Sequence, residues 1–143
     1  MNHNLVVSRS VDVAASPEKV WEAMTNPEII KEYLFGTHTV TDWKPGSDII
    51  FQGEWQGQVY KDKGVVKENI PLKRISYTYW SAFTGLEDIP ANYSLVTMEL
   101  EPLSENLTRF TWTQKGFGSE EGYNHSLSGI EAFMDSIKAV MER

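Results

Sequence analysis

The 143-residue sequence contains no cysteine, few basic residues relative to acidic ones, and no long apolar run. Without cysteine, disulfides, thiol chemistry and cysteine-based metal sites are all excluded. No apolar stretch approaches the roughly 20 residues that a membrane-spanning helix needs, so we expect no membrane insertion. Met1 to Asn4 lack the basic flank and apolar core of a secretory signal, which predicts a cytoplasmic location.

Positive charge is scarce, with 13 Lys and Arg residues against 20 Asp and Glu residues and a net charge of −7. Nucleic acids and anionic membranes both require a positive footprint, so we expect neither as a partner. The three histidines, His3, His38 and His125, follow no metal-binding spacing. Phosphate-binding glycine loops and Ser–His–acid patterns are also missing. We therefore predict no metal, no cofactor and no catalytic residue.

Two pairs of residues near the start predict two short helices. Ser16-Pro17 and Asn26-Pro27 each combine a capping side chain with a proline suited to the first helical position. Gly36 is expected to end the second helix. Near the other end, apolar residues recur at spacings of three and four, which predicts a long amphipathic helix through Leu127, Ile130, Met134, Ile137 and Met141.

Apolar and polar residues alternate between these helices, as in an antiparallel sheet that is wet on one face. The expected strands are Leu5–Val13, Thr37–Trp43, Ser47–Gly53, Gln58–Ile70 with a break at Lys61–Gly64, Ile75–Trp80, and two more around Met98 and Trp112, with a loop over Ser81–Ala91. We therefore predict one α+β domain over residues 1–143. A curved antiparallel sheet of about six to seven strands wraps around the C-terminal helix, with two short helices after the first strand.

A sheet that is too curved to seal against one helix would leave a cavity between the sheet and the last helix, and the alternative for the residues that face this space is ordinary packed core. Tyr and Trp side chains combine apolar bodies with polar tips, which suits a small hydrophobic or aromatic ligand. The predicted cavity residues are Phe51, Tyr77, Tyr79, Met98, Phe110, Trp112 and Gln114 from the strands, and Ile130, Phe133, Met134 and Ile137 from the helix. This register requires Tyr77, Phe110 and Trp112 to be buried, with Thr78, Arg109 and Thr111 exposed.

Two further polar residues could reach the same cavity. Glu68 shares strand parity with Val66 and Ile70, and an inward carboxyl there would have a raised pKa and could act as a general base. His38 lies near a strand start, where it either faces the cavity or is a partly exposed structural histidine. A solvated role remains the alternative for Glu68 as well.

Several motifs resemble the START-like, or Bet-v-allergen-like, helix-grip superfamily (SRPBCC), in the branch named after the activator of Hsp 90 ATPase. The matching segments are Ser16-Pro17-Glu18-x-Val20-Trp21-x-Ala23-x-Thr25-x-Pro27-Glu28, Pro45-Gly46, Gly64-x-Val66-x-Glu68, Ile75-x-Tyr77-Thr78, and Thr108 to Thr113 followed by Gly116-Phe117. The resemblance implies the helix-grip fold. It also implies proteins that bind lipids or aromatic metabolites, contact chaperones, or act as enzymes.

Three functions thus stay open at this point. The first is binding of a small hydrophobic molecule, with the Tyr33-Leu34-Phe35 segment as a lid. The second is modulation of a chaperone ATPase through protein contact. The third is an enzyme that acts on a hydrophobic substrate, with Glu68 or His38 as base.

Overall fold

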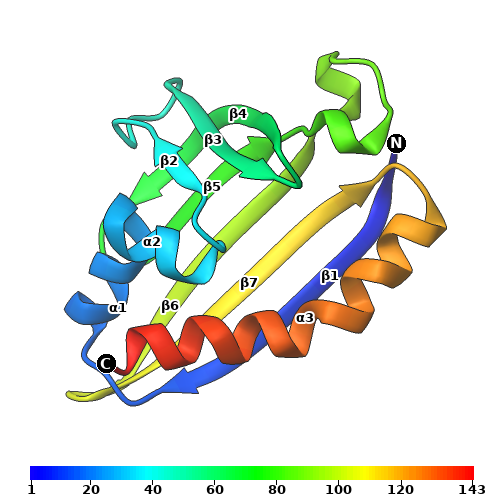
Figure 1. Cartoon of the computed structure of the whole chain (residues 1–143). Coiled ribbons are helices and arrows are strands. Elements are labelled where there is room, and N and C mark those ends of the chain that lie inside the picture. The colour runs from blue at the N-terminus through cyan, green and yellow to red at the C-terminus, as the bar shows by residue number, and fades with distance from the viewer.

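The computed structural model describes residues 1–143 and contains one seven-stranded antiparallel sheet with three α-helices (Figure 1). The strand order is β1-β7-β6-β5-β4-β3-β2. The elements are β1 (Asn2–Val13), α1 (Pro17–Thr25), α2 (Pro27–Tyr33), β2 (His38–Val40), β3 (Asp48–Trp55), β4 (Gln58–Ile70), β5 (Arg74–Tyr79), the 3₁₀ turns η1 (Ala82–Thr84) and η2 (Pro90–Asn92), β6 (Ser94–Ser104), β7 (Leu107–Phe117) and α3 (Glu120–Met141). This confirms the predicted α+β helix-grip fold.

The two short helices begin at the predicted caps. The Ser16 side chain accepts a hydrogen bond from the Lys19 amide at 3.2 Å, and the Asn26 side chain accepts one from the Glu28 amide at 3.0 Å. Asn26 also ends α1, so the chain turns there between two separate helices. The buried Tyr33 hydroxyl donates to the Ala23 carbonyl at 2.8 Å, which ties α2 to α1.

Helix α3 covers one side of the sheet rather than its centre. It packs chiefly against β1, and Figure 1 shows it crossing in front of β1 and β7 while β2, β3 and β4 lie towards the opposite side. Its buried residues are Ile130, Met134, Ile137, Val140 and Met141, close to the predicted stripe. None of the helices is both long and apolar enough to cross a membrane.

The strand register agrees with the predicted parity. Tyr77 and Phe110 are buried in the core, while Arg109 is exposed and forms an ion pair with Asp12. Trp112, which is half-buried, deviates from the expected full burial. Thr78 and Thr111 are likewise half-buried rather than exposed: the Thr78 hydroxyl accepts from the Val65 amide at 2.9 Å, and the Thr111 hydroxyl lies 2.7 Å from that of Ser10.

Two predicted strand boundaries are wrong. The strand expected over Thr37–Trp43 is only His38–Val40, because Trp43 adopts a positive φ of 63° and its indole donates to the Thr25 carbonyl instead. The break expected at Lys61–Gly64 does not exist, since these residues pair continuously with Ile49–Gln52 of β3. Gly64 is required by close packing rather than by a turn: a Cβ there would lie 1.6 Å from the Thr78 carbonyl oxygen.

Candidate functional site

A cavity of about 870 Å³ lies between the sheet and α3. This volume is within the range of about 300–1,000 Å³ that is usual for small-molecule sites. Nineteen residues line it, twelve of them hydrophobic: Leu34, Phe35, Thr37, Phe51, Glu54, Trp55, Tyr60, Asp62, Tyr77, Tyr79, Phe83, Val96, Trp112, Gln114, His125, Ser126, Gly129, Ile130 and Phe133. The space lies beside α3, which packs chiefly over β1, whereas α1 contacts β6 and β7.

Aromatic rings form much of the cavity wall. The Phe51 ring lies 5.4 Å from the Tyr77 ring and 5.9 Å from the Tyr79 ring, measured between centroids. Across the cavity, Trp112 of β7 meets Phe133 of α3 edge to face at 5.1 Å. These contacts hold the rings in fixed positions, so the wall offers a largely preformed apolar surface.

Asp62 is a buried carboxylate in this apolar wall, with only 8% of its surface exposed. Its Oδ2 accepts a hydrogen bond of 2.5 Å from the Tyr79 hydroxyl. Burial, followed by the charge of Asp62, raises the pKa of Tyr79 well above its ordinary value, so Tyr79 remains a protonated donor. The four ion pairs of the protein lie elsewhere, and none includes Asp62.

Tyr77 brings an unpaired hydroxyl to the cavity. The side chain is 4% exposed, lines the cavity and donates no hydrogen bond to another protein group. Burial also raises the pKa of Tyr77, so its hydroxyl stays neutral. The hydroxyl oxygen is accessible from the cavity, because it has no hydrogen-bond partner in the protein and is not one of the fully buried unpaired polar atoms. Tyr77 is therefore available for a polar group of a bound molecule.

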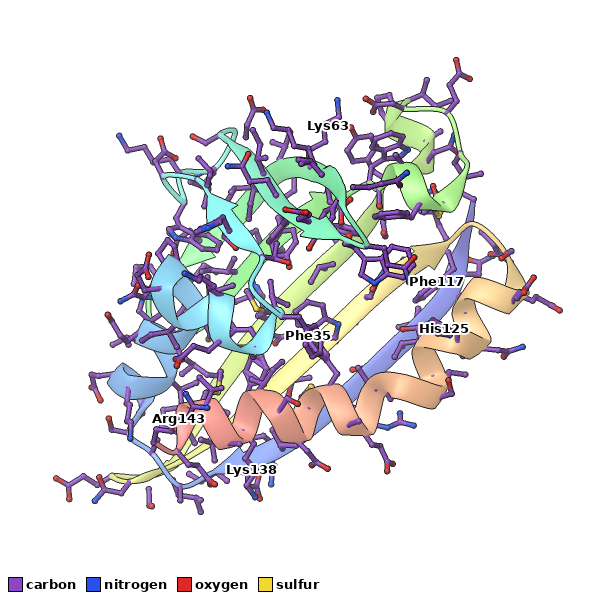
Figure 2. The ribbon with its side chains drawn as sticks, in the orientation of Figure 1. Phe35, Lys63, Phe117, His125, Lys138 and Arg143 are labelled. Atoms are coloured by element: carbon purple, nitrogen blue, oxygen red, sulfur yellow. The ribbon has the colours of Figure 1, made fainter.

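The remaining polar groups lie around these residues and at the mouth. The hydroxyls of Thr37 and Tyr60 lie 2.6 Å apart, and the Gln114 amide donates to Ser94 Oγ at 3.3 Å. Phe35, which is 85% exposed, lines the opening (Figure 2). Figure 2 shows it after α2, with His125 on the first half of α3. No group of three or more His, Asp or Glu residues could hold a metal ion.

The predicted cavity residues divide into two groups. Phe51, Tyr77, Tyr79, Trp112, Gln114, Ile130 and Phe133 line the cavity. Met98, Phe110, Met134 and Ile137 do not line it, because they are buried in the core cluster beyond one end of the space. Phe110 pairs with Val11 of β1 and Leu100 of β6, on the side where α3 seals against the sheet.

Glu68 and His38 both lie outside the cavity. Val66 pairs with Tyr77 while Glu68 pairs with Ser76, so Lys67 is an extra residue in β4 that turns Glu68 to the outer face. There, Glu68 forms an ion pair with Arg74 at 3.2 Å. His38 is exposed on β2, and only its neighbour Thr39 is buried. The inward positions considered for these two residues are therefore wrong.

Sequence reasoning missed several lining residues, above all Asp62 and His125. Asp62 was hidden by the expected break in β4, although Tyr60, Asp62, Gly64 and Val66 share one parity in an unbroken strand. His125 precedes Gly129 and Phe133 at helical spacings of four, which would have placed it on the cavity side of α3. Leu34 and Phe35, from the predicted lid segment, do line the cavity, whereas Tyr33 is core.

The chain matches known proteins over nearly its whole length. The model of a family described as activator of Hsp90 ATPase homolog 1-like protein matches residues 14–142. A protein from Cytophaga hutchinsonii, with a solved solution structure, is 38% identical and covers 99% of this chain and 97% of that chain, with a TM-score of 0.82. No curated protein sequence matches significantly.

Two more distant structures share the fold alone. An HSP90 activator from Plasmodium falciparum is 17% identical, covers 96% of both chains and has a TM-score of 0.74. The Aha1 dimer from Colwellia psychrerythraea is 18% identical, also covers 96% of both chains and has a TM-score of 0.72.

Proposed function

We propose that this chain, which belongs to the activator of Hsp90 ATPase homolog 1-like family, binds a small hydrophobic or aromatic molecule between its sheet and α3. The observation that carries this proposal is the cavity of about 870 Å³, with its largely hydrophobic lining. The Tyr77 hydroxyl, which is accessible from the cavity and has no hydrogen-bond partner in the protein, adds a polar group for orienting such a molecule.

The energetics favour a ligand with a compact apolar body. Each Å² of apolar surface removed from water contributes about 25 cal/mol, so a two-ring aromatic molecule enclosed by Phe51, Trp112 and Phe133 would gain several kcal/mol before its entropic cost. Tyr77 and Gln114 would then fix its orientation through hydrogen bonds.

Titration calorimetry with 1-naphthylmethanol, a neutral two-ring probe, tests the proposal. We expect saturable binding with one site per chain. Measured at several temperatures, the binding should have a negative heat-capacity change, because apolar surface is buried. If neither this probe nor a panel of neutral lipids and aromatic metabolites binds saturably, the proposed function is wrong.

A second candidate is modulation of a chaperone ATPase through protein contact. Membership of the family supports it, as does the likeness in fold to an HSP90 activator. The net charge of −7 would favour association with a basic surface. The test is the steady-state ATPase rate of an Hsp90 chaperone with and without this protein. A rate that is unchanged at saturating concentration excludes this candidate.

The enzymatic alternative has less support. Its two suggested bases, Glu68 and His38, are both outside the cavity lining. A reaction in this cavity would have to use Asp62, Tyr77, Tyr79 or His125 instead, and the one hydrogen bond that joins two of these residues is that from Tyr79 to Asp62.

A further inference from the structure

We infer that the ligand of this cavity carries a positively charged amine, which the Asp62 carboxylate binds among aromatic side chains. The inference rests on the proposed function, because it assumes that the cavity binds a small molecule. It adds the chemical class of that molecule: a hydrophobic or aromatic amine rather than a fatty acid or another organic anion.

The charges around the cavity are of one sign. Among its nineteen lining residues there is no Lys or Arg, whereas Glu54 and Asp62 are both acidic. His125, an exposed residue at the mouth, is the only lining side chain that could become positive. An anionic ligand would find no counter-charge here and would be repelled by both carboxylates.

The position of Asp62 directs its charge inward. In the β3–β4 ladder Asp62 lies opposite Phe51, a buried residue that also lines the cavity. Its neighbours Lys61 and Lys63 are exposed on the other face, and Lys63 forms an ion pair with Asp88 at 2.5 Å. No protein cation therefore compensates the Asp62 carboxylate.

One oxygen of Asp62 remains available to a ligand. Oδ2 accepts the Tyr79 hydroxyl at 2.5 Å, while Oδ1 accepts no hydrogen bond from the protein. A buried carboxylate is costly unless it is paired and fully hydrogen-bonded, and an ammonium group supplies both a positive charge and three donors. A second donor of that ammonium could be accepted by the Tyr77 hydroxyl oxygen, which is also unpaired.

The rings around Asp62 suit the same ligand. Phe51, Tyr77 and Tyr79 form one cluster, with centroid distances of 5.4 and 5.9 Å from Phe51. The face of an aromatic ring attracts a cation within about 6 Å of its centroid, and this attraction increases when water is excluded. A carboxylate bordered by aromatic rings is thus selective for a cation attached to an apolar body.

Three probes with the same ring system test the inference: 1-naphthylmethylamine, 1-naphthylmethanol and 1-naphthoate, each titrated calorimetrically at neutral pH. The amine should bind at least about tenfold more tightly than the alcohol, as expected for a charge-assisted hydrogen bond, and the carboxylate most weakly. Asp62→Asn, which keeps the shape and removes the charge, should reduce amine affinity to that of the alcohol. Asp48→Asn, the same change at an exposed residue of β3 outside the lining, is the matched control and should retain the preference.

The outcomes separate this inference from the proposed function. If no probe binds, the proposed function fails. If the alcohol binds but the amine binds no better, or if Asp62→Asn keeps the preference, the amine inference alone is overturned. Should Asp62→Asn not fold, Tyr79→Phe provides the second variant. This variant keeps the Asp62 carboxylate and removes the hydroxyl that donates a hydrogen bond to it. The preference for the amine over the alcohol must therefore persist. Loss of this preference would contradict the inference.

Discussion

The Trp112 ring on β7 and the Phe133 ring on α3 meet edge to face, with centroids 5.1 Å apart. Both side chains are half-buried and both line the cavity. Because one residue belongs to the sheet and the other to the helix, their contact joins the two layers at the point where the cavity begins. Residues on one side of this pair form the cavity wall, and residues on the other side form packed core.

Trp112→Ala should weaken ligand binding while costing less stability than truncation of a core aromatic. Phe110, two residues earlier on the same face of β7, is fully buried, so Phe110→Ala should destabilise by about 3–5 kcal/mol. Trp112 already borders open space, and its truncation leaves less new cavity. Urea unfolding and titration with 1-naphthylmethanol measure the two effects. An equal loss of stability with unchanged affinity would mean that Trp112 is core.

Met134→Ala should destabilise the protein by about 2–5 kcal/mol without changing ligand affinity. Met134 is buried on α3 and does not line the cavity, so its role is to seal the helix against the sheet. Glu131→Ala, an exposed change on the same helix, should remain within about 0.5 kcal/mol of wild type. An affinity loss in Met134→Ala with little destabilisation would instead assign this residue to the cavity wall.

Gly64→Ala should destabilise the sheet by about 1–3 kcal/mol or more, because the new Cβ would clash with the Thr78 carbonyl oxygen. The matched control is Gly129→Ala on α3, where a Cβ meets nothing within 4 Å. This helical substitution should stabilise by up to about 1 kcal/mol. Thermal unfolding of both variants provides the comparison, and a neutral Gly64→Ala would contradict the close approach of β4 and β5.

Stability should fall as the pH rises above about 10, the ordinary pKa of tyrosine. Burial raises the folded-state pKa of Tyr33, Tyr77 and Tyr79, so the unfolded chain loses these protons first and is favoured at alkaline pH. Below pH 10 both states are protonated and this contribution is constant. Urea unfolding across this range should give a shallower decline for Tyr77→Phe than for wild type. Equal slopes would show that the Tyr77 pKa is not raised by folding.

Local signals in the sequence were sufficient to predict the elements that frame the site. Ser16, Asn26 and their following prolines specify two helix starts through contacts within three residues, and these are the caps that the structure contains. The apolar stripe from Leu127 to Met141 likewise predicts the last helix and, from Ile130 onward, its buried face. Such patterns are reliable because they depend on neighbours along the chain.

The cavity could be predicted only in part, because strand parity gives the face of a residue but not whether packing is open or closed above it. Phe110 and Trp112 share a face, and their different roles depend on where α3 crosses β7. The extra residue at Lys67 moves the Glu68 side chain to the opposite face of the sheet, and no local sequence pattern predicts this bulge. Asp62 was missed because the nearby Gly64 resembled a turn residue and so predicted a break in the strand. Gly64 is instead required by the close approach of the Thr78 carbonyl oxygen on β5.

The most direct test of ligand binding in the cavity is to fill the cavity with a side chain. Gly129 lines it from α3 and has open space beside it, whereas Ala132 is exposed on the same helix outside the lining. The measurement is the affinity for 1-naphthylmethanol of Gly129→Phe against Ala132→Phe. We predict at least about a tenfold loss for Gly129→Phe, since excluding about 60 Å² of apolar contact costs that much, and wild-type affinity for Ala132→Phe. Unchanged binding by a folded Gly129→Phe variant would contradict a ligand site between the sheet and α3.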